Sequence, residues 1–249
     1  MSSSSLDYSI SARGKPAGMP VEAFIKFFFD ALPIKSVFGF REYTPLYGGR
    51  NFVEPELSDA DIAWMYDNGI GYRIPLQNSI ANRADYEDNK WFLEKYHRAG
   101  NSVILVKPEM AGWIRDDFPL FESEASVILQ ARTVEKAEEL LNSFDVVVLH
   151  PELNDEKEEL ARLADKDRIR LFANAGCMYK CPTMECYASL SRLNKRIPGA
   201  QYKCAMHRDT EYLAERMQVT GMTEFDIDGL IGLGFSKFKR LRSKGKSGY

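Results

Sequence analysis

The sequence has little that would place the protein in a membrane, outside the cell or on a nucleic acid. No apolar run in its 249 residues approaches the roughly 20 residues that a membrane-spanning helix needs. The N-terminal stretch MSSSSLDYSISARGK lacks the apolar centre of a signal peptide. A net charge of -3 gives no overall attraction to nucleic acids or acidic membranes. We therefore expect a cytoplasmic protein with no membrane span.

Cysteine is also scarce, and it is confined to one segment. Cys177, Cys181, Cys186 and Cys204 are all the cysteines of the chain, and their spacing is C-x3-C-x4-C-x17-C. Disulfides are rare in the cytosol, and clustered thiolates favour zinc or an iron-sulfur cluster. Structural zinc usually takes tight C-x2-C pairs, whereas clusters accept wider spacing. The spacing predicts a metal site and favours a cluster over zinc, with four unrelated thiols as the alternative.

Segments typical of strands and of helices alternate along the chain. Strands are expected near residues 37, 73, 104, 123, 147 and 171, with a weaker one near 218–220 and a last one in KFKRL. Ser58 and Thr133 are expected to cap helices. The strands recur roughly every 25 to 35 residues, as βαβ units do. Eight such units predict an α/β fold with a single (β/α)8 barrel domain, and a doubly wound open sheet is the alternative.

The two ends of the chain differ in composition from its middle. Residues 1–18 are polar, Ser-rich and aperiodic, which predicts a flexible N-terminal tail. The barrel is expected over residues 19–243, with a Cys-rich metal-binding insertion at 174–207. Residues 244–249 are expected to be a basic C-terminal tail. This basic end leaves RNA possible but less favoured as a partner, with Lys239, Arg240 and Arg242 as contacts.

Polar residues follow the expected strands at their C-terminal ends, where both architectures place their working groups. The predicted substrate-binding residues are Arg41, Asn78 and Lys107, and the predicted catalytic residues are Glu124, His150 and Asn174. Plainer roles are open for several of them. Arg41 and Lys107 could be solvated loop charges, and His150 could satisfy a loop carbonyl. Glu124 lies in an apolar strand, so its carboxylate would need a partner inside the barrel.

Several motifs resemble one known family. They are KPAGMPVEAFIKFFFDAL, YGGRNF, VVVLHPELNDEKEEL, LFANAGC, SRLNKRIPGAQYKC and GFSKFKRLRSKGKS. These stretches resemble the collagenase-like peptidase family of unknown catalytic type, which includes iron-sulfur proteins of oxygen-independent ubiquinone and RNA hydroxylation. The resemblance implies a (β/α)8 barrel with a 4Fe-4S cluster on the four cysteines.

The chain departs from the family pattern at three places. Pro151 stands where the family has Arg before Glu-Leu, Asn174 stands where it has His, and Cys204 is single where it has paired cysteines. The sequence has no HExxH motif and no evident Ser-His-Asp or Cys-His arrangement, which disfavours a peptidase.

We therefore expect a 4Fe-4S barrel protein that takes part in an oxygen-independent hydroxylation or related redox modification. Its expected partners are a small or hydrophobic substrate and a homologous or redox partner protein. If all four thiolates bind the cluster, no iron is open to substrate, and the cluster transfers electrons or holds structure. The alternatives are a metal-stabilised binding module, with structural zinc or a cluster and possibly RNA as ligand, or a peptidase-like protein without redox activity.

Overall fold

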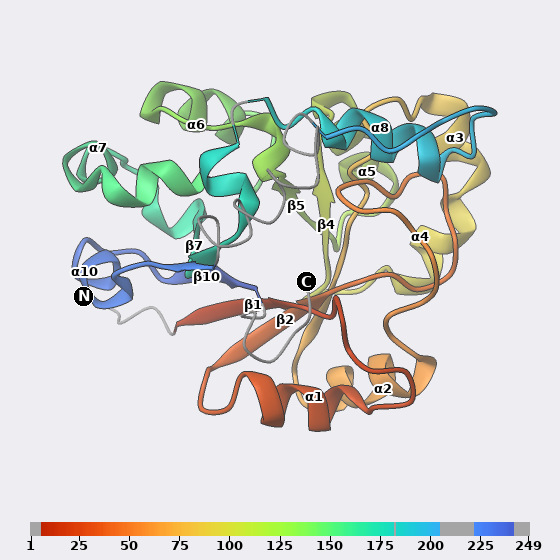
Figure 1. Ribbon diagram of the computed structural model, residues 1–249, viewed down its shortest axis with the longest axis horizontal. Coiled ribbons are helices and arrows are strands. Elements are labelled where there is room, and N and C mark those ends of the chain that lie inside the picture. Colours follow the sequence, from red (N-terminus) through yellow and green to blue (C-terminus); the bar gives the residue numbers. More distant parts are fainter. Residues whose placement is uncertain (1–5, 182, 205–221, 242–249) are drawn as a thin grey trace, which may run out of the picture.

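The computed structural model describes residues 6–181, 183–204 and 222–241, and eight parallel strands of this part form a closed barrel (Figure 1). The strands are β1 (Asp7–Ser11), β2 (Ile34–Phe38), β3 (Gly71–Ile74), β4 (Ser102–Leu105), β5 (Glu122–Ala125), β6 (Val146–Val148), β7 (Ile169–Phe172) and β10 (Lys237–Arg240). From β2 to β7 each strand pairs with its neighbour in sequence. Strand β10 lies between β7 and β1, and β1 pairs with β2. The predicted barrel is confirmed, and the open sheet is wrong.

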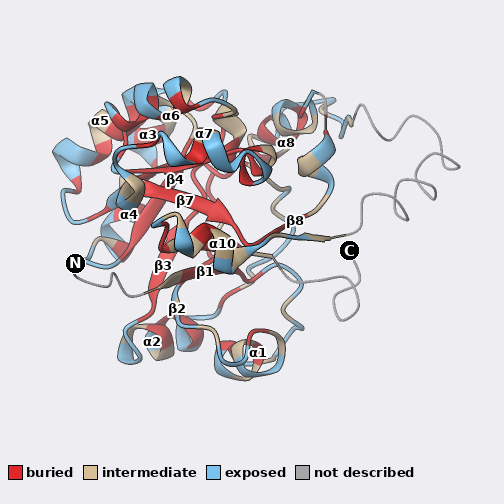
Figure 2. Cartoon of the chain, turned by 90° about the vertical axis from the view of Figure 1, so that its left-hand side faces the viewer, coloured by how far each residue is buried: buried red, intermediate tan, exposed pale blue. Residues whose placement is uncertain are grey.

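Helices lie outside the strands, with their apolar sides inward and their polar sides exposed (Figure 2). They are α1 (Val21–Phe28), α2 (Asp59–Asp67), α3 (Arg83–Asp88), α4 (Lys90–Tyr96), α5 (Pro108–Asp117), α6 (Val134–Leu141), α7 (Lys157–Ala161), α8 (Cys186–Asn194) and α10 (Ile227–Gly232). The side chains of Ser58 and Thr133 accept hydrogen bonds from the first turns of α2 and α6, as expected of N-caps.

The N-terminal segment corrects a prediction. Residues 7–11 are not a flexible tail, because they form β1 and hydrogen-bond to strands on both sides. Ser9 and Ser11 are buried inside the barrel, so their polarity reflects polar partners there and not solvent. The weaker strand expected near 218–220 and the tail at 244–249 lie outside the described residues. The eighth strand is therefore β1, which the sequence pattern did not indicate.

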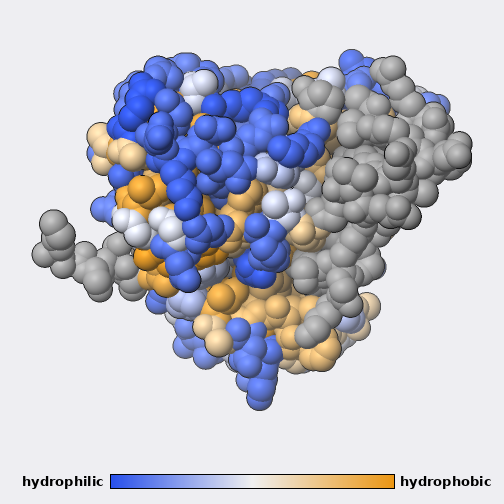
Figure 3. All heavy atoms as spheres, turned by 60° about the vertical axis from the view of Figure 1, so that its left-hand side comes forward, coloured by the Kyte–Doolittle hydropathy of each residue, from blue (hydrophilic) through white to orange (hydrophobic). Residues whose placement is uncertain are grey.

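The apolar core fills the space between the strands and the surrounding helices. Hydrophilic residues cover much of the face shown in Figure 3, and apolar residues gather low in that view, on the side where Figure 1 places α1. Phe27 of α1 is 59% exposed. Within the described ranges, the helices are all too short or too polar to cross a bilayer.

The cysteine segment leaves the barrel at the C-terminal end of β7. It starts with the short strand β8 (Asn174–Ala175), which pairs antiparallel with β9 (Thr223–Glu224). A 3-10 turn over Cys177–Lys180 and helix α8 follow. Figure 1 shows α8 at the top of the molecule beside α3, and Lys195 at its end forms an ion pair with Asp85 of α3 at 2.7 Å. The segment thus covers part of the barrel mouth, the end at which the C-termini of the strands lie.

Candidate functional site at the barrel mouth

A charged layer crosses the interior of the barrel. Ser9, Arg73, Glu124 and Arg170 come from the alternate strands β1, β3, β5 and β7, which is how one layer of a (β/α)8 interior is built. Arg73 contacts both the Ser9 hydroxyl and one Glu124 oxygen, and Arg170 Nε lies 2.9 Å from the other. Glu124 is fully buried. The expected partner of the Glu124 carboxylate is therefore a pair of arginines.

Lys239 lies in β10, opposite Ser9 of β1 and Phe172 of β7. Its Nζ is 4.3 Å from the ring centre of Phe38 and 5.6 Å from that of Phe172. The side chain is 6% exposed. Burial, followed by the charges of Arg73 and Arg170, holds the pKa of Lys239 well below its ordinary value. This interior position contradicts the role of Lys239 as an exposed RNA contact.

The other two residues of the predicted RNA patch do not restore it. Arg240 forms an ion pair with Glu224 at 2.9 Å, so part of its charge is compensated by an acid on β9. Arg242 lies outside the described residues. In the part of the chain that the structure describes, Lys239 is therefore buried and the charge of Arg240 is partly compensated, so neither residue is a free contact for RNA.

A small cavity opens above Lys239, and we call it the mouth cavity. It has a volume of about 130 Å³, and its lining includes Ser11, Gln77, Phe172, Tyr187 and Lys239. These residues come from the C-terminal ends of strands or from the segment that follows β7. Its walls combine aromatic faces with a few polar groups, as small-molecule sites commonly do.

A second cavity, which we call the cysteine cavity, adjoins the first. It has a volume of about 800 Å³, and Cys177, Cys186 and Tyr202 are among its lining residues. The two cavities share Arg13, Gly49, Arg50 and Tyr187. The cysteine segment thus forms a wall between a large open pocket and the smaller pocket over Lys239.

The four thiols occupy one neighbourhood. Burial raises the pKa of Cys186 to about 12, and the charges of Cys204, Cys177 and Cys181 add to the shift. Cys181 is buried and Cys177 is exposed, while the other two are half-buried. Since mutual repulsion disfavours ionisation, a bound cation would be needed to hold these groups as thiolates together.

The four thiols are a donor set that suits either a cluster or a zinc ion. Across the described residues, no three His, Cys, Asp or Glu side chains are arranged to hold one metal ion. Thiolates on one zinc lie about 3.8 Å apart, because each is about 2.3 Å from the metal. A four-iron cluster has one iron for each thiolate and accepts more widely spaced sulfurs. The backbone N–H of Met184 donates to Cys181 Sγ at 3.3 Å, and Tyr202 hydrogen-bonds to Cys204, contacts that suit thiolate ligands.

Helix α8, which begins at Cys186, is fixed to the barrel loops by buried amides. Asn194 donates through Nδ2 to Tyr47 O at 2.9 Å and to Arg50 O at 2.7 Å, and its Oδ1 accepts from Phe52 N at 2.8 Å. Asn78 donates to Ser191 O at 2.9 Å and to Pro45 O at 2.7 Å. These bonds set the position of the cysteine segment over the mouth.

His150 follows β6 and is fully buried. Burial, helped by the nearby charge of Arg132, lowers the pKa of His150 from 6.5 to about 4, and a hydrogen bond with the Met178 backbone opposes the shift. The Nδ1 atom accepts weakly from Glu152 N at 3.4 Å. His150 is therefore a neutral imidazole at pH 7, next to the cysteine segment.

Asn174 and Asn78 are both buried, and both use their amides within the protein. Asn174 donates to Leu241 O at 2.9 Å and accepts from Leu241 N at 2.8 Å, which ties β8 to the end of β10. A substrate would have to compete with these contacts, and with those of Asn78 to α8. The predicted catalytic and substrate-binding roles of these two residues stay predictions.

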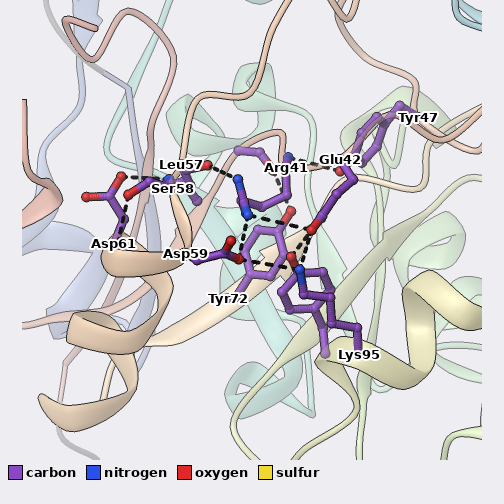
Figure 4. Close-up of polar contacts among 11 residues, drawn as sticks. Arg41, Glu42, Tyr47, Leu57, Ser58, Asp59, Asp61, Tyr72 and Lys95 are labelled. Carbon is purple, nitrogen blue, oxygen red and sulfur yellow. Dashed lines mark hydrogen bonds and ion pairs between the residues drawn. The ribbon is translucent and has the colours of Figure 1, made fainter. Parts of the chain in front are cut away.

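Arg41 is held by the loop before α2 and by the first residue of that helix (Figure 4). Its Nη1 donates to Leu57 O at 2.7 Å and its Nη2 to Asp59 Oδ1 at 2.6 Å. Arg41 also lines the cysteine cavity. Lys107, by contrast, lies outside both cavities and is 3.7 Å from Glu109 Oε1. The structure therefore places Arg41 on the same cavity as Cys177 and Cys186 and leaves Lys107 outside it.

Sequence reasoning missed Lys239 and Tyr187 as site residues. Lys239 stands in a basic stretch, where its charge indicated a solvated tail. Its position in the last strand could have identified it. Lys239 lies opposite the inward Ser9 of β1, and inward side chains near the C-terminal ends of the strands face the barrel mouth. Tyr187 directly follows Cys186 in the first turn of α8, and this position makes it line both cavities.

Comparisons with known proteins support the fold and no more. No protein-family model matches the sequence, and no curated protein matches it. Among solved structures, the chain is similar to the U32 peptidase Mk0906, with a TM-score of 0.63 and 14% identity. The match covers 98% of this chain and 95% of that one. The chain therefore has the fold of a U32 peptidase, a member of the collagenase-like family that its motifs resemble.

Proposed function

We propose that the protein binds a 4Fe-4S cluster on Cys177, Cys181, Cys186 and Cys204 and takes part in an oxygen-independent hydroxylation or related redox modification. The observation that carries the proposal is that the four thiols lie in one neighbourhood and that two of them, Cys177 and Cys186, line the cysteine cavity, which adjoins the mouth cavity. The resemblance to the iron-sulfur members of the collagenase-like family supports the same assignment. The substrate would be small or hydrophobic.

When bound, such a cluster supplies one-electron transfer, because each iron already has a protein thiolate. The chain's own residues bind and orient the substrate. Aromatic faces of Phe38 and Phe172 form apolar walls of the mouth cavity, and Gln77 supplies a polar edge. Neutral His150 lines neither cavity, but it hydrogen-bonds to the backbone of Met178, which lines the mouth cavity, so it positions that wall. With water as the source of the oxygen atom, introducing a hydroxyl group releases two protons and two electrons from the substrate and water, so a redox partner protein must receive the two electrons.

Metal analysis tests the cluster directly. Protein purified without oxygen should be brown and contain about four irons and four sulfides per chain. Cys204→Ala should lose this metal, because its thiolate closes the ligand set from the far end of the segment. Lys180→Ala is a matched control, since Lys180 is an exposed residue between two of the cysteines. It should retain the full metal content.

A colourless protein with one zinc would overturn the cluster and favour the metal-stabilised binding module. A protein whose metal content is unchanged in all four Cys→Ala variants would overturn the ligand set. Nucleic-acid binding that weakens steeply with added salt would support the module with RNA as its ligand.

The redox role needs its own experiment. Electrochemistry under argon should find a reversible couple in the metal-loaded protein. His150→Gln should keep the iron and the couple but lose activity in cells grown without oxygen. Activity would be followed by mass spectrometry as the loss of metabolites that carry one additional oxygen atom. A cluster that cannot be reduced, or normal metabolites in cells that lack the protein, would contradict the redox role.

A second candidate is peptidase activity, which the fold similarity to a U32 peptidase favours. Fluorogenic peptides and gelatin are suitable probes. Hydrolysis that persists in metal-free protein and disappears on His150→Gln would support this candidate over the redox role.

A further inference from the structure

Lys239 is a basic residue that is buried at the mouth of the barrel. In the part of the chain that the structure describes, no carboxylate oxygen lies within 4.0 Å of its Nζ, and its closest aromatic contact is Phe38. Isolated buried charges are costly, so buried lysines usually pair with an acid or lose their proton. The position therefore favours a neutral amine.

The interior charges explain why no acid is available. Glu124 already contacts Arg73 and Arg170, and Asp7 lies 3.0 Å from Arg170 Nη2. Two carboxylates thus balance two guanidinium groups, one layer below Lys239. Burial and the same arginines keep the pKa of the Lys239 amine low. A neutral lysine beside cationic groups is a nucleophile at neutral pH.

The mouth cavity gives this amine a space to react in. Its volume of about 130 Å³ is roughly that of four liquid waters, which admits a molecule of a few non-hydrogen atoms. Phe38 and Phe172 flank the amine, while Arg13 and Arg50 also line the cavity. A small carbonyl compound matches this combination of amine, apolar walls and a cationic rim, in which Arg50 also forms an ion pair with Glu56.

We propose that Lys239 is a reactive amine that captures small aldehydes or keto acids as imines in the mouth cavity. The nitrogen attacks the carbonyl carbon to give a carbinolamine. Water then leaves, carrying the carbonyl oxygen and both amine hydrogens, and a C=N bond remains. No oxidant or reductant is needed. The inference goes beyond the proposed redox role and does not depend on a bound cluster.

Reductive trapping of the full chain tests this inference. Folded protein at pH 6.5 is incubated with glyoxylate and cyanoborohydride, which adds hydride to the imine carbon and makes the bond permanent. Peptide mass spectrometry then gives a labelling rate for each lysine. Lys239 should be labelled at least tenfold faster than Lys237, which lies on the same strand nearer the other end of the barrel. The result should be the same with and without metal.

Lys239→Met should abolish the fast site, whereas Lys237→Met should keep it. Methionine fits a buried apolar setting, and thermal unfolding checks that this variant is folded. If it is not, the rates within the wild-type chain still decide. Labelling of Lys239 only above about pH 9, or no faster than surface lysines, would overturn the proposal, because the amine would then be protonated or closed off.

Discussion

Glu124 is the residue on which the interior of the barrel depends most. Its carboxylate is fully buried between Arg73 and Arg170, and neither arginine is exposed by more than 2%. Buried charges of this kind stabilise the protein only when they are paired. A buried guanidinium group without its carboxylate retains the whole desolvation penalty, which no attraction then offsets. The residue predicted as catalytic is thus also a structural centre.

Glu124→Gln should destabilise the protein by about 3 to 5 kcal/mol, because it leaves two buried guanidinium groups with one carboxylate fewer. Urea unfolding followed by circular dichroism measures the change. Glu138→Gln is the control: it removes an exposed acid on α6, away from the layer, and should change the stability by less than about 0.5 kcal/mol. Equal effects of the two substitutions would contradict the charged layer.

His150 makes stability depend on pH. Its folded pKa of about 4 lies below the unfolded value of 6.5, so between these values the unfolded chain binds a proton that the folded chain does not. Stability should therefore fall by roughly 3 kcal/mol as pH drops from 6.5 to 4. Unfolding free energies measured across this range give the slope.

His150→Phe should flatten the slope, whereas Arg132→Gln should keep most of it, because burial is the larger cause of the shift. If Arg132→Gln removes the slope and His150→Phe does not, the titration belongs to another group.

At the scale of elements, α8 is the part that links the cysteines to the barrel. Its last residue, Asn194, makes three hydrogen bonds to backbone groups of the loop after β2. Removing these bonds leaves buried peptide groups unsatisfied, which costs more than the bonds themselves contribute. The position of Cys186 therefore depends on an amide at the opposite end of its helix.

Asn194→Ala should cost about 2 to 4 kcal/mol and should lower metal uptake, because α8 is no longer held in place. Asn68→Ala is the matched control: Asn68 also donates to a backbone carbonyl, Trp64 O at 2.8 Å, but it is exposed. The control should cost less than about 1 kcal/mol. Full iron content in a destabilised Asn194→Ala protein would separate the two roles and contradict the link.

Most elements were predictable from local patterns, and the exceptions have physical reasons. Strands such as Val146–Val148 are apolar because both of their faces are covered, so composition alone indicates them. Strand β1 carries serines inward, where Arg73 supplies a partner from β3. That contact spans 64 residues of sequence, so no local pattern could reveal it. Lys239 was missed for the same reason, since its surroundings come from other strands.

At the scale of the whole molecule, β1 and β10 close the barrel. Deleting residues 1–11 should prevent a compact fold, because β2 and β10 would both be left as unpaired edges. Deleting residues 1–5 leaves β1 entire and is the control. Size-exclusion chromatography and circular dichroism compare the two truncated proteins. A compact and cooperative fold without β1 would show that closure is dispensable.

Closure by the first and last strands also has a consequence for synthesis on the ribosome. Asp7 of β1 lies opposite Lys237 of β10, so β1 leaves the ribosome long before its partner exists. At about 5 to 20 residues per second, the wait lasts roughly 10 to 50 s. During that interval the open edges of β1 and β7 could pair with other nascent chains. The inward serines of β1 and the inward Arg170 of β7 make both edges poor templates for such aggregation, which gives the same polar interior a role before the barrel is complete.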